Sequence, residues 1–251
     1  MNKRWEILPI DEKKQILLEK NLHISSSLAE ILTRKNLDEN SAKLFLNPTK
    51  IPYHDPFLLK DMEKACQRLL LALKNKEKIC IYGDYDVDGV SSTALLMTVF
   101  TKLGFNIDYY LPDRHSEGYG LHIESLQKLI PKYDLLITVD CGITALDEVD
   151  YAKDKIDMII TDHHLPREIL PDAFAIINPT QTQCNYPNKN LCGVGVAFKL
   201  CQGLYQSLNK DIHELENYLD IVALGTIADI VPLVDENRRI AKKGLANIQN
   251  L

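Results

Sequence analysis

The sequence predicts an α/β fold: a doubly wound, mostly parallel sheet with flanking helices and a helical N-terminal extension. Two observations support this prediction. From residue 78 onward, short apolar segments alternate with segments of helical periodicity. The first sixty residues instead have the pattern of short helices. Strands that alternate with helices are typical of parallel sheets, because a crossover helix returns the chain to the same edge of the sheet.

The elements follow in order along the chain. We expect residues 1–60 to form a helical lead-in packed on the core, and residues 61–251 to form one α/β domain. The periodicity predicts early helices at 11–20, 27–33 and 38–46, a proline-punctuated loop from Pro48 to Pro56, and a helix that starts at Met62 behind Asp61 as a candidate cap. Strands are then predicted at 79–83, 106–111, 135–139, 156–160 and 173–177, with helices at 90–103, 122–130, 144–153, 193–208, 213–228 and 239–251.

Composition narrows the class of protein. The content of 45% hydrophobic and 25% charged residues is that of a globular domain, and no apolar stretch is long enough for a transmembrane or secretory segment. The six cysteines form no Cys-x-x-Cys pair, which disfavours a sulfur-based zinc site and a disulfide framework and favours a cytoplasmic protein. The net charge of −6 argues against a surface that by itself coats nucleic acid.

Acidic and imidazole side chains follow three of the predicted strands. Because the carboxyl ends of the strands line one crevice in an open α/β sheet, we expect all of these side chains to converge there. They are Asp84, Asp86 and Asp88 after the first strand, Asp140 after the third, and Asp162, His163 and His164 after the fourth.

So many carboxylates would repel one another unless cations are present. Oxygen ligands with one or two imidazoles suit Mn²⁺ or Mg²⁺. Two such ions sharing ligands would form a two-metal centre, which clamps the attacking and leaving oxygens of a phosphoryl group. The pattern therefore predicts a two-ion Mn²⁺ or Mg²⁺ site for phosphoryl chemistry.

A competing interpretation of Asp84-Tyr-Asp-Val-Asp-Gly89 is an EF-hand calcium loop, whose opening it matches. An EF-hand needs a bidentate Glu at the twelfth position, where this chain has Leu95, and a helix before the loop, where a strand is predicted. Both mismatches disfavour it.

Other segments leave alternatives open. Asp140 by itself could cap the next helix, and Asp162-His163-His164 by itself could be a solvated turn. The segment Cys192-Gly-Val-Gly-Val-Ala197 could hold a phosphate on its backbone amides or serve tight helix packing. In the glycine-bounded loop 112–120, Arg114, His115 and Glu117 either include a phosphate contact through Arg114 or form a solvated turn.

Four segments, in order, resemble the motifs of the DHH phosphoesterases: Asp84–Gly89, Val139-Asp140, Asp162-His163-His164 and Gly225-Thr-Ile-Ala-Asp229. The resemblance implies that Asp86, Asp88, Asp140, His163 and Asp229 bind the metals, with Asp140 bridging. It also implies catalytic roles for Asp84, which would support or ligate the metals, and for His164, which would contact the scissile phosphate or the leaving group. Some members have His where this chain has Tyr82, and Asp84 is the candidate to take over that ligand position.

Segments outside these motifs are most similar to the family's single-strand-specific DNA exonucleases, namely Asp55-Pro56, the 112–120 loop, Asn178-Pro179, Gly193–Phe198 and Asp229–Leu233. This similarity implies 5′-to-3′ hydrolysis of single-stranded DNA in recombination and repair, with single-strand binding protein or a helicase as possible partners. An oligoribonuclease, nucleotide phosphatase or cyclic-dinucleotide phosphodiesterase of the same family is the first alternative, and a non-catalytic replication module is the second.

Such exonucleases also carry a DHH-associated domain and an OB-fold, and neither is recognisable here. We therefore expect a fragment of a longer protein whose DNA-gripping basic surface lies on those domains. The charge agrees with this, since the six motif aspartates carry as much formal charge as the net −6 of the chain.

Overall fold

The structure is a computed structural model that describes residue 6 and residues 9–114 and 117–248. The chain divides into two compact units, Met1–Pro52 and Tyr53–Leu251. Each unit has a hydrophobic cluster of its own.

The N-terminal unit consists of the three predicted helices, α1 (Glu12–Leu22), α2 (Ser26–Arg34) and α3 (Glu39–Leu46), followed by a 3₁₀ turn at Pro48–Lys50. Asp11, Ser25 and Asp38 begin the three helices, and each side chain accepts a hydrogen bond from a backbone N–H in the first turn. Leu18, Leu32 and two alanines form the small core between them.

The larger unit is built on a five-stranded sheet in the order β2-β1-β3-β4-β5. All neighbouring strands pair in parallel, so the predicted mostly parallel sheet is parallel throughout. The strands are β1 (Lys78–Tyr82), β2 (Asn106–Tyr110), β3 (Leu135–Val139), β4 (Asp157–Thr161) and β5 (Ala175–Ile177). The chain runs outward from β1 to β2 and then returns to β3 on the other side of β1. A topological switch point of this kind opens a crevice at the carboxyl ends of β1 and β3, where ligands bind in such sheets.

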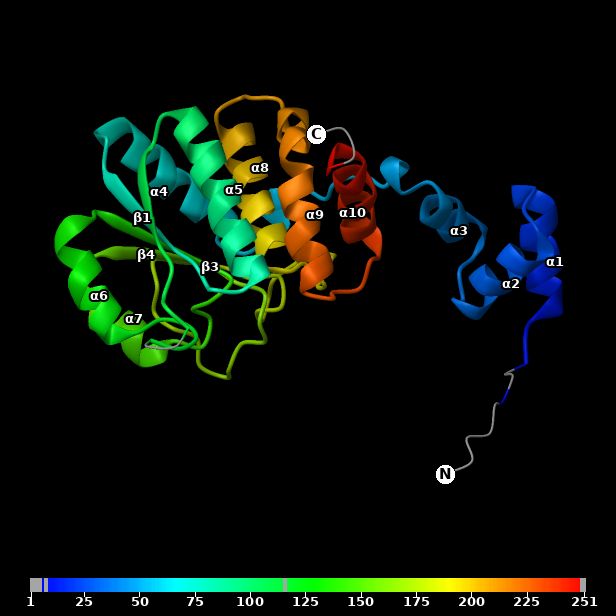
Figure 1. The fold of residues 1–251 in the computed structure, drawn as a ribbon, viewed down its shortest axis with the longest axis horizontal. Helices are drawn as coiled ribbons and strands as arrows, with labels where there is room; N and C mark the ends of the chain where they lie inside the picture. Colours follow the sequence, from blue (N-terminus) through cyan, green and yellow to red (C-terminus); the bar gives the residue numbers. More distant parts are fainter. Residues whose placement is uncertain (1–5, 7–8, 115–116, 249–251) are drawn as a thin grey trace. The chain divides into compact units, whose positions relative to one another are not determined.

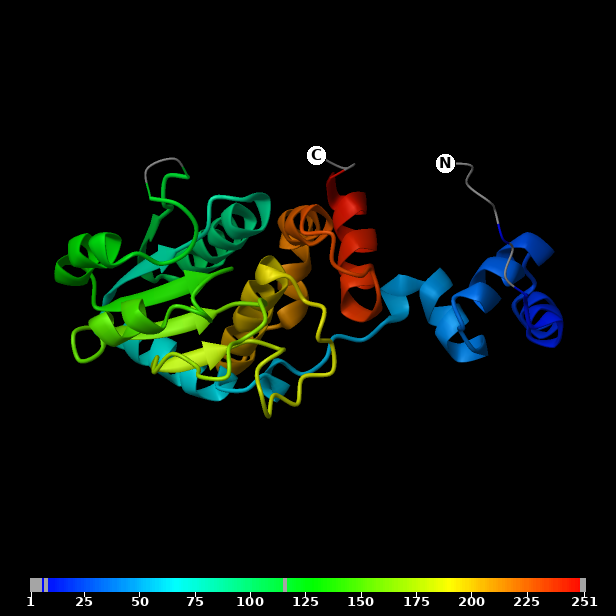
Figure 2. The same ribbon diagram turned by 90° about the horizontal axis from the view of Figure 1, so that it is seen from below.

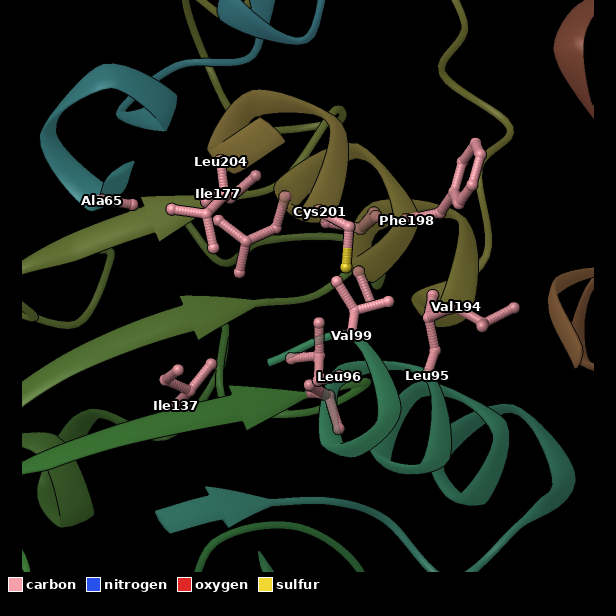
Figure 3. Close-up of a cluster of buried hydrophobic side chains, with 14 of the residues drawn as sticks. Ala65, Leu95, Leu96, Val99, Ile137, Ile177, Val194, Phe198, Cys201 and Leu204 are labelled. Atoms are coloured by element: carbon pink, nitrogen blue, oxygen red, sulfur yellow. The ribbon is translucent and has the colours of Figure 1, made fainter. Parts of the chain in front are cut away.

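Helices cover both faces of the sheet, as a doubly wound fold requires (Figures 1 and 2). On one face, α4 (Met62–Asn75), α5 (Val87–Leu103) and α8 (Gly193–Ser207) pack on alternate strand residues such as Ile81 and Ile137. Figure 3 shows the centre of this layer, where Leu96 and Val99 of α5 lie between Ile137 and Cys201. On the other face, α6 (Ile123–Leu129) and α7 (Leu146–Ala152) cover the intervening strand residues.

The C-terminal helices differ from the prediction. A single helix was expected at 213–228, but the chain forms a 3₁₀ segment at Ile212–Tyr218 and only then α9 (Leu219–Ala228). The carbonyl of Glu216 accepts a hydrogen bond from Asn247 of α10 (Asp235–Ile248) at 2.9 Å. This tertiary contact competes with α-helical pairing of that carbonyl, and the sequence pattern does not reveal it.

One further expectation, the helix cap at Asp61, is corrected. Asp61 precedes α4 but makes no capping bond, because its carboxylate accepts the backbone N–H of Ile176 at 3.1 Å.

Tyr82 is fully buried and donates its hydroxyl to the carbonyl of Gly120 at 3.0 Å, so it is a core residue. All six cysteines are buried free thiols. Among the described residues, no helix is both long and apolar enough to cross a bilayer.

Candidate metal centre

The predicted site residues come together at the carboxyl ends of β1, β3 and β4. Asp84 follows β1, Asp140 follows β3 directly, and Asp162, His163 and His164 follow β4. Two more carboxylates come from helices: Asp88 lies in the first turn of α5, and Asp229 ends α9. A strand precedes the Asp84–Gly89 segment and Leu95 is buried in α5, which excludes the EF-hand interpretation.

His163 lies at the centre of this group. Its Nε2 is 3.2 Å from Oδ1 of Asp140, 3.8 Å from Oδ2 of Asp229 and 3.9 Å from Oδ2 of Asp88. Carboxylates from three segments of the chain therefore lie close to one imidazole nitrogen.

Among the described residues, three overlapping groups have ligand atoms within 4.8 Å of one another. They are Asp140, His163 and His164; Asp88, His163 and Asp229; and Asp84, Asp86 and Asp140. Asp140 belongs to two of the groups, one containing His163 and the other Asp84 and Asp86. This position is the one that a bridging ligand between two ions would occupy. Asp84 lies in the group that contains Asp86, whereas Tyr82 belongs to none of them.

Several of these oxygens are buried without a hydrogen-bond partner. Both carboxylate oxygens of Asp84, Oδ1 of Asp140 and Oδ2 of Asp229 receive no hydrogen bond from the described residues. A buried carboxylate oxygen without a partner costs free energy. Divalent cations would satisfy these oxygens, so the residues present fit the predicted metals.

The pKa values of the carboxylates also favour bound cations. Burial, together with the charges of Asp88 and Asp86, raises the pKa of Asp140 to about 10. Burial also raises the pKa values of Asp84, Asp88 and Asp229. Bound cations would oppose these shifts by stabilising the ionised carboxylates.

The N-terminus of α8 fixes the carboxylate of Asp88. The backbone N–H of Gly193 donates to Oδ2 at 2.5 Å, and that of Val194 donates to Oδ1 at 2.8 Å. These amides hold a protein carboxylate, so the glycine segment serves close packing rather than phosphate binding. A Cβ at Gly193 would lie 2.6 Å from Oδ1 of Asp140, and one at Gly225 would lie 2.8 Å from Oδ1 of Asp88.

Asp140 is held in an unusual backbone conformation. Its φ of 61° lies in the left-handed region, which non-glycine residues seldom adopt. Its backbone N–H donates to the carbonyl of Thr161 at 3.0 Å, and the hydroxyl of Thr138 donates to the carbonyl of Cys141 at 2.8 Å. Since α7 begins after Ala145, Asp140 is not a cap of that helix. Strain of this kind concentrates at functional sites.

Asp162 and His164 form a hydrogen-bonded pair. Asp162 is buried and accepts the backbone N–H groups of Ile143, His163 and His164. Its Oδ1 also lies 2.7 Å from Nδ1 of His164. That hydrogen bond, outweighing burial of the ring, raises the pKa of His164 to about 9. Burial acts to raise the pKa of Asp162, but His164 and the backbone amides reverse the effect and leave it lowered. Asp162 therefore orients His164, whose side chain is 44% exposed.

Arg114 and Glu117 of the 112–120 loop have different environments. Arg114 is exposed, and its guanidinium lies over the ring of Tyr85, 5.4 Å from the ring centroid, beside the first motif. Glu117 has a structural role, because it accepts hydrogen bonds from the hydroxyls of Tyr110 and Ser125 and from the backbone of Asp113. His115 lies outside the described residues.

One residue near the centre was not singled out from the sequence. The hydroxyl of Tyr119 lies 3.3 Å from Nε2 of His164, and the two rings meet edge to face. The sequence signal that could have identified Tyr119 is its pair of flanking glycines, Gly118 and Gly120. Both adopt positive φ, which glycine allows.

Comparison with known proteins agrees with this geometry. The family model "DHH family, N-terminal domain" matches residues 78–226. The single-stranded-DNA-specific exonuclease RecJ of Bacillus subtilis is 45% identical over 98% of this chain and 31% of its own length. That of Haemophilus influenzae is 42% identical over 87% of this chain and 38% of its own length.

Among solved structures, RecJ from Thermus thermophilus in complex with Mn²⁺ matches 97% of this chain and 34% of that chain, with 29% identity and a TM-score of 0.82. The chain thus spans about a third of the length of these relatives. The match to the family model covers the first three motifs and the first two residues of the fourth, and the side chains of the motifs form groups that could hold metal ions. The chain belongs to the DHH family.

Proposed function

We propose that this chain carries the hydrolytic centre of a metal-dependent exonuclease that removes nucleotides from single-stranded DNA in the 5′-to-3′ direction. The observation that carries the proposal is the buried cluster around His163, in which several carboxylate oxygens have no hydrogen-bond partner among the described residues. The names of the RecJ relatives support the substrate and the mode of cleavage. Proposed roles in recombination and repair, and a cytoplasmic location, follow from the same similarity.

Asp84, Asp86, Asp88, Asp140, His163 and Asp229 would hold two Mn²⁺ or Mg²⁺ ions. When bound, such ions neutralise charge on the phosphoryl oxygens and lower the pKa of water. The contribution of the chain is to hold the ligands rigidly. The α8 amides orient Asp88, and the backbone at the carboxyl end of β3 fixes Asp140.

His164 has the geometry of a residue that meets the substrate. Asp162 holds Nδ1, so Nε2 is the atom left to donate a proton or hydrogen bond to a phosphate or leaving oxygen. The hydrogen bond with Asp162 raises the pKa of the imidazole to about 9, which favours the protonated ring. Arg114, which makes no ion pair with any residue the structure describes, would contact a backbone phosphate beside the centre.

The test is hydrolysis of single-stranded DNA labelled at the 5′ or the 3′ end, with Mn²⁺, Mg²⁺ or chelator. We expect rapid release of the 5′ label as a nucleotide, slow shortening of the 3′-labelled strand, and no reaction with chelator or with Asp140→Asn. Duplex DNA and short oligoribonucleotides serve as comparison substrates. Faster cleavage of the oligoribonucleotides would favour the alternative activity within the family, and release from the 3′ end would contradict the polarity.

Partners are a separate proposal. Single-strand binding protein or a helicase could deliver the strand, and co-sedimentation with each on single-stranded DNA would test this.

A further inference from the structure

A cavity of about 610 Å³ adjoins the metal centre. Its lining comes from the 112–120 loop, the segment after β3 and the segment after β4. The residues that matter here are Tyr119, Leu121, Thr144, His164, Leu165 and Arg167. His164 lines this cavity and also belongs to a ligand group with Asp140 and His163, so the cavity and the centre share this side chain.

The lining combines apolar and cationic side chains with two carboxylates, Asp162, which is paired with His164, and Glu148. Tyr119 is half exposed and Leu165 is 79% exposed, so an aromatic and an aliphatic side chain stand open to a ligand. Arg167 is exposed and makes no hydrogen bond or ion pair with the part of the chain that the structure describes. In a chain of net charge −6, a free arginine next to an acidic cluster is a suitable contact for an anion that reaches this side of the centre.

We propose that this cavity binds one nucleotide of the strand, adjacent to the scissile phosphate, with its base against Tyr119 and Leu165 and a backbone phosphate on Arg167. This inference rests on the proposed function, because it places a nucleic-acid strand across His164. Aromatic side chains bind bases of any sequence by stacking, and arginine binds the phosphate. A nucleotide suits this cavity because its base fits the apolar side chains and its phosphate fits Arg167. The cavity also shares His164 with the metal centre.

The experiment measures binding of two small probes to the Mn²⁺-loaded chain by calorimetry: 2′-deoxyadenosine 5′-monophosphate, and 2-deoxyribose 5-phosphate, which lacks the base. We expect the nucleotide to bind roughly tenfold more tightly, the effect of one stacked base. Tyr119→Ala should remove most of this difference, whereas Tyr119→Phe, which keeps the ring, should preserve it. Arg167→Ala should weaken both probes by a similar factor.

Leu165→Ala should reduce the difference, and Ile169→Ala is its matched control, because Ile169 is 70% exposed nearby but does not line the cavity. Each variant is also titrated with Mn²⁺ alone, to confirm that the metal centre is intact. Equal binding of the two probes to the unmodified chain, or a base preference that survives Tyr119→Ala, would overturn the proposal. Loss of the proposed function appears separately, as failure of the unmodified chain to hydrolyse labelled DNA.

Discussion

The carboxylate of Asp88 lies against the backbone of Gly193, with Oδ2 2.5 Å from the amide nitrogen. The two residues are 105 positions apart in the chain. The contact joins the first turn of α5 to the first turn of α8, and the helix dipole of α8 favours the negative charge. The same glycine faces Asp140, so one backbone position constrains two of the proposed metal ligands.

Gly193→Ala should therefore weaken metal binding. The added Cβ would lie 2.6 Å from both Cβ and Oδ1 of Asp140, which forces that carboxylate out of place. Changes in groups that orient metal ligands cost about 10- to 100-fold in affinity, and we expect a loss in that range for Mn²⁺ by calorimetry.

Gly195→Ala is the matched control in the same helical turn. The atoms nearest to its added Cβ would be side-chain atoms of Leu191 and Cys192, at 3.3 Å and beyond. If both variants bound Mn²⁺ as the unmodified chain does, the close approach of Gly193 to Asp140 would have no role in the centre.

Asp140→Asn should separate metal binding from folding. The amide is nearly isosteric and removes a charge that burial and neighbouring carboxylates oppose. In chelator we expect the variant to melt at or above the temperature of the unmodified chain. With Mn²⁺ the unmodified chain should gain several degrees, since the ion binds the folded state, and the variant should gain little. An equal Mn²⁺-dependent gain in both proteins would contradict the bridging position of Asp140.

The sequence predicts the strands well where their apolar pattern is continuous. Leu135–Val139 was placed without error, because all five residues are buried between two layers and the run has no competing interpretation. The helix after it was predicted from residue 144, but α7 begins at Leu146. The amide of Ile143 binds the carboxylate of Asp162, and Ala145 closes a turn on Gly142, so this segment is held by the site rather than by helix formation.

The convergence of the candidate ligands was predictable because parallel strand ends meet and the motif order identifies the family. The residues that orient the ligands were not. Asp162 accepts the backbone amide of Ile143, and α8 holds Asp88, only because segments distant in sequence meet in the fold. No periodicity or spacing encodes contacts of this kind. The role of Tyr119 was not predictable for the same reason, since it contacts a histidine 45 residues away in the sequence, His164.

Breaking a buried ion pair outside the centre should destabilise the fold strongly. Lys199 of α8 lies 3.2 Å from Glu236 of α10, and both side chains are fully buried. Glu236 also accepts from the hydroxyl of Tyr186, and Lys199 donates to the carbonyl of His54 at 2.7 Å. Lys199→Met would leave a buried carboxylate without its cation, and we expect a loss of about 3–5 kcal/mol in the free energy of unfolding by denaturant titration.

The double variant Lys199→Met, Glu236→Gln should be more stable than the single variant, because it removes the unpaired charge. A single variant with unchanged stability would show that the pair contributes no net free energy.

Glu216 should contribute stability that depends on pH. It accepts from Arg239 at 2.7 Å and from Lys243 at 2.5 Å, linking the 3₁₀ segment to α10. Burial opposes ionisation, but the two cations outweigh it and lower the pKa from 4.5 to about 2. Because the folded-state pKa is depressed, the contribution is fully present above about pH 4.5 and is lost as the pH falls through about 2.

Glu216→Gln should therefore lower the free energy of unfolding by about 1–2 kcal/mol near neutral pH, allowing for partial solvent screening. The difference from the unmodified chain should shrink as the pH falls from about 4.5 towards 2. Glu214→Gln is the control in the same segment, since Glu214 forms only a surface pair with Lys102 at 3.3 Å, with both side chains nearly half exposed. Its effect should be small at every pH. A Glu216→Gln difference that stayed constant down to pH 2 would mean that the two cations do not stabilise the ionised carboxylate, and that the amide loses only packing and hydrogen bonding.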